Sequence, residues 1–105
     1  MEKKRIQETA FADERFTKHN LFRQNNETVF VLNLKPDQEL PPHKHPNRHL
    51  YIMGFEGEGQ FMIDGDRYDC AAGDTFSIAA DEDFGVKNVS DGNFRAYAVM
   101  VKQSE

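Results

Sequence analysis

The sequence has a single cysteine, no tryptophan, four prolines and seven glycines among 105 residues. Because Cys70 has no partner in the chain, an intramolecular disulfide is excluded, and we expect a reducing compartment, the cytoplasm. The longest apolar run, residues 96–101, is far too short to cross a bilayer. The N-terminal residues contain no apolar stretch, so we expect no secretory signal peptide.

Positive charge is also in short supply. The 13 Lys and Arg residues are outnumbered by 18 Asp and Glu residues, which gives a net charge of −5, and no basic run follows residues 3–5. This balance argues against binding to nucleic acid and to anionic membrane surfaces. In contrast, nine Phe and three Tyr are spread along the chain. Since disordered segments lack such aromatic residues, we expect a folded protein, and the length suits one domain.

From residue 28 onward, short apolar segments alternate with turn residues. Asp64-Gly65 predicts a two-residue hairpin turn, because a type I′ turn needs positive φ at both positions. No stretch of this region shows a sustained helical period. Seven or eight short strands at this spacing predict an all-β fold, a sandwich or a barrel. The expected strands cover residues 28–34, 50–55, 60–63, 66–70, 75–79, 84–89 and 94–102.

The first twenty residues differ from the rest. They are rich in charge, with Phe11 and Phe16 as isolated apolar points. We interpret residues 1–20 as an N-terminal arm and residues 21–105 as the barrel domain.

Three of the four histidines, His43, His45 and His49, fall within seven residues. On an extended strand, residues two apart point to the same face, so His43 and His45 are expected side by side. Two adjacent imidazoles can present ring nitrogens to one metal ion. His49 becomes a third ligand if the following strand turns it inward. The alternative is that this proline-rich segment is a solvated loop without a ligand.

These residues resemble the cupin superfamily. The first cupin motif reads Gly, five residues, His-x-His, three or four residues, Glu, six residues, Gly, and it is matched by 43–45 and Gly57. The second motif is matched by 73–74 and Asn88. The resemblance covers residues 29–101 and implies a single cupin-type β-barrel or jelly roll of short antiparallel strands. It also implies a homodimer paired through edge strands.

The sequence departs from the cupin pattern at the metal ligands. The motif-one Glu falls on Leu50 when it is counted back from Gly57, and on His49 when it is counted forward from His45. The motif-two His falls on Phe84. One ligand is therefore lost, and a second is either lost or exchanged for His49.

Each alternative has its own chemistry. By the resemblance, His43, His45 and His49 together would hold a divalent transition metal, namely Zn, Fe, Ni, Mn or Cu. Leu50 and Phe84 at ligand positions would instead make the interior more apolar, which is typical of a small-ligand cavity.

Four further residues are candidates for ligand binding beside Phe84. Arg48 is suited to a carboxylate, because a guanidinium can bind it in a bidentate manner. Tyr51 and Met53 line the interior if His49 faces inward, whereas Ile52 does so if Leu50 faces inward. Gln60 is a candidate to complete a coordination shell. No catalytic residue can be assigned from these patterns.

Three hypotheses follow for function. The first is a barrel that binds a small molecule, with a metal through the histidine cluster as an option. The second is a metal-dependent small-molecule enzyme of the oxygenase or isomerase type that uses three histidines. The third is a non-enzymatic module that docks a partner through the arm, residues 1–20. Since cupins host many chemistries, the fold by itself does not choose among them.

Overall fold

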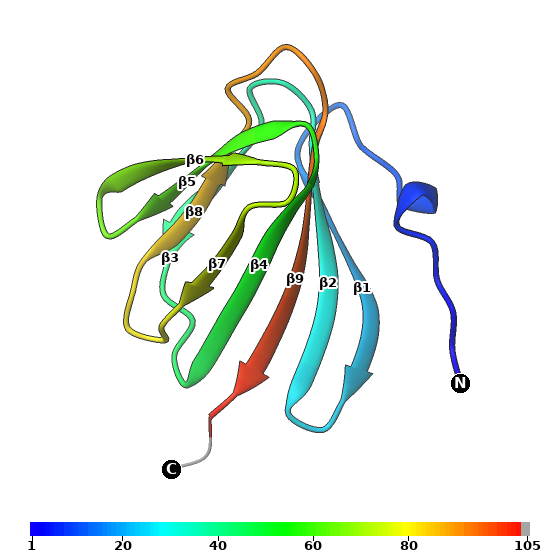
Figure 1. The fold of residues 1–105 in the computed structure, drawn as a ribbon, viewed down its shortest axis with the longest axis vertical. Helices are drawn as coiled ribbons and strands as arrows, with labels where there is room; N and C mark the ends of the chain where they lie inside the picture. Colours follow the sequence, from blue (N-terminus) through cyan, green and yellow to red (C-terminus); the bar gives the residue numbers. More distant parts are fainter. Residues whose placement is uncertain (104–105) are drawn as a thin grey trace.

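The computed structural model describes residues 1–103, which form a β structure of two sheets (Figure 1). One short 3-10 turn, η1 (Ile6–Glu8), precedes the strands. No helix in this part of the chain is long and apolar enough to cross a membrane. The strands are β1 (Thr17–Gln24), β2 (Glu27–Leu34), β3 (Glu39–His43), β4 (Arg48–Glu56), β5 (Glu58–Ile63), β6 (Asp66–Ala71), β7 (Thr75–Ile78), β8 (Phe84–Lys87) and β9 (Phe94–Lys102).

The strands pair only in the antiparallel sense within the described residues. One sheet has the order β1-β2-β9-β4-β7, and the other has the order β3-β8-β5-β6. Figure 1 shows the two sheets facing one another, with strands that are distant in sequence, such as β4 and β9, side by side. The expected all-β jelly roll is confirmed.

The seven expected strands are present, and their ends differ from the expected ones by at most two residues. The Asp64-Gly65 turn has φ of 50° and 87°, as its expected type requires. Two further strands, β1 and β3, lie outside the seven expected ranges. β3 contains two prolines and a bulge between Leu40 and His43. Proline has no backbone N–H to donate to a neighbouring strand. It is tolerated in β3 because β3 is an edge strand, which pairs on one side only.

The space between the sheets is filled by apolar side chains. Phe61 is fully buried, and its ring lies 4.9 Å from that of Phe76, 5.2 Å from Phe84 and 6.2 Å from Phe94, measured between centroids. The three contacts are edge-on, which is a favourable arrangement for aromatic pairs. The largest buried side chains therefore pack on one another, and the space between the sheets is an apolar core.

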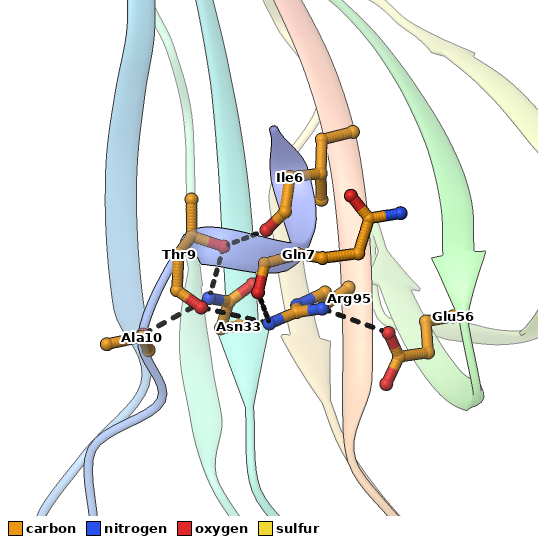
Figure 2. Close-up of polar contacts among 7 residues, drawn as sticks. All are labelled: Ile6, Gln7, Thr9, Ala10, Asn33, Glu56 and Arg95. Atoms are coloured by element: carbon orange, nitrogen blue, oxygen red, sulfur yellow. Dashed lines mark hydrogen bonds and ion pairs between the residues drawn. The ribbon is translucent and has the colours of Figure 1, made fainter. Parts of the chain in front are cut away.

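The arm lies against the outer face of the larger sheet (Figure 2). Arg95 donates from Nη2 to the carbonyl oxygens of Thr9 (2.9 Å) and Gln7 (3.4 Å), and from Nη1 to Glu56 (3.0 Å). Asn33 donates from Nδ2 to Thr9 Oγ1 (2.9 Å) and to the carbonyl oxygen of Ala10 (3.1 Å). A buried arginine thus ties the arm to β9, and a buried asparagine ties it to β2.

The arm is shorter than the sequence suggested. β1 begins at Thr17, so residues 17–20 belong to the larger sheet, where they pair with β2. Thr17 Oγ1 also donates to the carbonyl oxygen of Ala10 (2.7 Å), which joins the end of the arm to the first strand. The arm proper is therefore residues 1–16.

Candidate functional site

A small cavity of about 160 Å³ opens between the two sheets at the end of the barrel where β4 begins and β9 ends. Most of its wall is apolar, and its polar groups are one lysine and two histidines. The wall consists of Phe16, Lys18, Phe30, Leu32, Leu40, His43, His45, Leu50, Phe84 and Met100.

The orientation of the side chains on β4 shows which residue takes the position of the cupin Glu. Leu50 is 1% exposed and lines the cavity, and Ile52 follows it inward two residues later. His49 points to the opposite face, where its Nε2 lies 2.6 Å from Ser77 Oγ and its ring lies 4.6 Å from that of Tyr51. Since side chains alternate along a strand, Leu50 and His49 cannot both face the cavity. The structure favours Leu50.

The position of the motif-two His is taken by Phe84, which is 1% exposed at the start of β8. Its backbone pairs with that of His43, and its ring lies 6.5 Å from the ring of His45. Four residues that match cupin ligand positions, two histidines, Leu50 and Phe84, therefore line the same cavity. The fold has brought the site together, but two of its four side chains are hydrocarbon.

The histidine pair itself is well formed. The ring centroids of His43 and His45 are 4.4 Å apart, so the expected side-by-side placement is confirmed. His43 Nδ1 lies 3.1 Å from the carbonyl oxygen of Pro41, to which its N–H can donate, leaving Nε2 as the free acceptor. Burial lowers the pKa of His45 below the ordinary histidine value, and the nearby His43 acts in the same direction.

These donors do not fit a resident metal ion. Structural and catalytic sites for divalent transition metals use at least three protein ligands, and here His43 and His45 supply two. No group of three or more His, Cys, Asp or Glu side chains is arranged for a metal within residues 1–103. The three-histidine site with His49 is not assembled, because His49 is on the outer face of the sheet.

The other candidate ligand-binding residues are dispersed. Tyr51 and Met53 line a groove of about 400 Å³ on the outer face of the larger sheet, not the barrel interior. Gln60 accepts from Arg67 (3.3 Å) and donates to Asp69 (3.3 Å) on the face of β5 opposite the buried Phe61. These three residues are therefore not brought together with the histidine pair.

Arg48 lies closer to the cavity. With Arg23 and Met100 it lines an adjoining surface hollow of about 220 Å³, and Met100 is shared with the cavity wall. Arg48 is also near enough to His45 to contribute to its lowered pKa. Of the five candidate ligand-binding residues, Phe84 lines the cavity and Arg48 stands beside it.

Sequence reasoning missed Lys18. It lies on β1 opposite Leu32 of β2, and its Nζ is 4.5 Å from the centre of the Phe30 ring. The sequence carries little signal for this placement, since residues 17–20 are all polar. The strand was not expected because its segment is polar and belongs to an edge, where strand patterns are weak.

Cys70 and Asn88 are both buried and lie outside the cavity wall. Burial raises the pKa of the Cys70 thiol to about 11, so this cysteine is not a ready nucleophile at neutral pH. Asn88, the motif-two match, is fully buried and donates to the carbonyl oxygens of Leu34 (2.9 Å) and Gly92 (2.8 Å). It holds the loop between β8 and β9 in place.

Comparison with known proteins agrees with this fold. The TT1209 protein of Thermus thermophilus superposes with a TM-score of 0.92 at 21% identity, covering 99% of this chain and 100% of that one. An RmlC-like cupin of Desulfovibrio desulfuricans gives 0.86 at 27% identity, with 96% of each chain covered. A predicted oxalate decarboxylase of Thermotoga maritima gives 0.78 at 21% identity, covering 83% of this chain and 80% of that one.

No curated protein matches this chain. A family model does, and its match extends over residues 30–100, which contain the histidine pair, Leu50 and Phe84. The family is described as the Cupin domain, and this chain belongs to it.

Proposed function

We propose that this cupin binds a small organic molecule in the cavity at the open end of its barrel, and does so without a resident metal. The observation that supports this proposal is the apolar character of two ligand positions, Leu50 and Phe84, in a cavity that is otherwise retained. A largely apolar pocket with a few polar groups is the usual form of a small-molecule site.

The size of the cavity limits the ligand. At about 160 Å³ it is smaller than most drug-sized pockets. An apolar cavity of roughly 150 Å³ in another protein binds benzene, so a single six-membered ring or a short aliphatic chain is the expected scale. A polar group of such a ligand would lie at the mouth, beside His43, His45 and Lys18.

The two alternative hypotheses have less support. The enzyme hypothesis requires a third metal ligand, and His49 is directed to the other side of β4. Some structural neighbours carry names of enzymes, a predicted oxalate decarboxylase and a sugar phosphate isomerase, but their identity to this chain is 21% and 19%. The docking hypothesis requires a free arm, whereas the carbonyl groups of Gln7, Thr9 and Ala10 already accept hydrogen bonds from the barrel domain.

The cavity proposal is testable by NMR of methyl-labelled protein with toluene as the probe. We expect toluene to shift the methyl resonances of Leu32, Leu50 and Met100, which line the cavity. Met100→Trp should abolish the shifts, because this half-buried residue stands at the mouth and an indole there would fill the space. Met62→Trp is the matched control, since Met62 is half-buried on β5 outside the cavity and should leave binding unchanged.

Shifts confined to the outer-face groove of Tyr51 and Met53, or equal binding by both Trp variants, would contradict the cavity as the site. Absence of any shift at saturating toluene would contradict small-molecule binding in the barrel.

We also propose that the chain forms a homodimer. The arm covers part of the outer face of the larger sheet and leaves an apolar groove over β4, β7 and β9, with Tyr51 50% exposed and β7 at the sheet edge. A second copy placed on this face would bury it.

Light scattering should give twice the 12.1 kDa chain mass, and Tyr51→Asp should give the monomer. Tyr68→Asp is the control, because Tyr68 lies on the edge strand β6 of the other sheet, and this variant should remain dimeric. A wild-type protein with the mass of a monomer would refute the dimer.

A further inference from the structure

The mouth of the cavity is surrounded by basic groups. Lys18, His43 and His45 belong to the wall itself. Arg23 and Arg48 line the adjoining hollow that shares Met100 with the cavity. The structure therefore gathers five basic side chains from β1, β3, β4 and the loop between β3 and β4 at one end of the barrel.

No acidic group lines the cavity. In the adjoining hollow the acidic side chain is Glu27, which forms no ion pair within residues 1–103. The ion pairs in that range are Lys35 with Asp13 and Arg95 with Glu56, and neither includes a group at the mouth. Basic groups therefore outnumber acidic groups at the entrance to the apolar cavity, in a protein whose net charge is −5, and such a local excess attracts anions.

The basic groups at the mouth affect one another. Partial burial lowers the pKa of Lys18, and the charges of Arg23 and Arg48 act in the same direction. Desolvation and the two neighbouring arginines both oppose the positive charge of Lys18, and a bound anion would offset that cost.

We propose that the ligand of the cavity is a small organic monoanion, a monocarboxylate with a single ring or a short aliphatic chain, whose carboxylate is bound by the Lys18 ammonium. This inference rests on the proposed function and specifies its ligand. The hydrocarbon part contacts Leu32, Leu50 and Phe84, and the carboxylate lies at the mouth between Lys18 and the histidine pair.

Lys18 is well placed for this role. Its Nζ stands 4.5 Å from the centre of the Phe30 ring, which is a wall residue with 4% exposure. The aliphatic stem therefore follows the apolar wall, and the ammonium remains at the boundary with solvent. A carboxylate at this boundary gains a charge-assisted hydrogen bond while the ring or chain is buried. His43 adds a second polar group, since its Nε2 is not used by the contact with Pro41.

The experiment compares benzoate with benzamide, which has nearly the same shape but no charge, by methyl-labelled NMR titration. The wild-type protein should bind benzoate about tenfold more tightly than benzamide, because hydrogen bonds to charged groups are the stronger ones. Lys18→Met, which keeps an unbranched apolar chain but removes the charge, should bring the two affinities to within about twofold of each other. Raising the salt concentration should weaken benzoate binding only.

Lys44→Met is the matched control. Lys44 is exposed between the two histidines and is not part of the cavity wall, so this variant changes the net charge equally. It should retain at least half of the benzoate preference. Equal affinities of benzoate and benzamide in the wild type, or equal losses in both lysine variants, would overturn anion recognition while the cavity proposal stands. Failure of toluene to bind would refute the cavity proposal separately.

Discussion

Leu50→Glu combined with Phe84→His is expected to convert the cavity into a metal site that binds about one Zn²⁺ or Ni²⁺ ion per chain. The wild-type protein should bind far less than one ion per chain after the same loading and desalting. In the variant, the two new donors join His43 and His45 in one cavity, so the number of ligands rises from two to four.

The effect on stability should be equally large. Leu50 is 1% exposed, and a carboxylate placed there without metal is desolvated, so the metal-free variant should be several kcal/mol less stable than the wild type. Metal ions that bind only the folded state stabilise it by mass action. The melting temperature of the variant should therefore rise steeply with metal, while that of the wild type should change little.

Plasma mass spectrometry and thermal unfolding with and without metal check both expectations. Adding His43→Ala and His45→Ala to the double variant should remove the metal, and Phe84→His alone, with three donors, should show intermediate binding. A stoichiometric metal in the wild-type protein that is lost with His43→Ala and His45→Ala would contradict the metal-free cavity and revive the enzyme hypothesis.

Removal of residues 1–10 is expected to destabilise the barrel strongly. Asn33 is fully buried on the outer face of β2, where it donates to Thr9 and Ala10 of the arm, and Leu21 of β1 is 7% exposed beside Thr9. Deletion removes the arm acceptors of Arg95 and Asn33 and exposes Leu21. Lost burial and lost hydrogen bonds together suggest a loss of about 3 kcal/mol in the free energy of unfolding.

For a domain of this size, such a loss corresponds to a fall of roughly 10–20 °C in melting temperature. Circular dichroism during heating is a suitable measurement. Removal of residues 1–4 is the control, because no hydrogen bond joins them to the barrel among the described residues. It should cost less than about 0.5 kcal/mol, as is usual for surface changes. Equal stability of the 1–10 deletion and the full chain would instead support an arm that is free to dock a partner.

The sequence predicted the strands that carry strong apolar patterns, and it missed the two that do not. Residues 28–34 and 94–102 were recognised because their inward side chains are nearly all apolar, as burial between two sheets requires. β1 and β3 are edge strands, and an edge tolerates lysine, asparagine and proline because one of its sides makes no ladder. Their positions depend on the neighbouring strands rather than on their own composition.

The site shows the same division. The amino-acid sequence alone determined that two histidines lie side by side, that a Glu and a His are missing from the cupin pattern, and that Phe84 takes one of their places. It could not decide whether His49 or Leu50 faces the interior, because the side chains of neighbouring strand residues point to opposite faces and the start of β4 was unknown.

Only the tertiary structure made that choice, through the pairing of β4 with β7 and β9, which turns Leu50 inward. Only the structure placed Lys18 in the cavity wall, since β1 reaches the histidine pair through pairing with β2 and not through proximity in sequence. The sequence determines which side chains are available for chemistry, whereas long-range strand pairing decides which of them share a cavity.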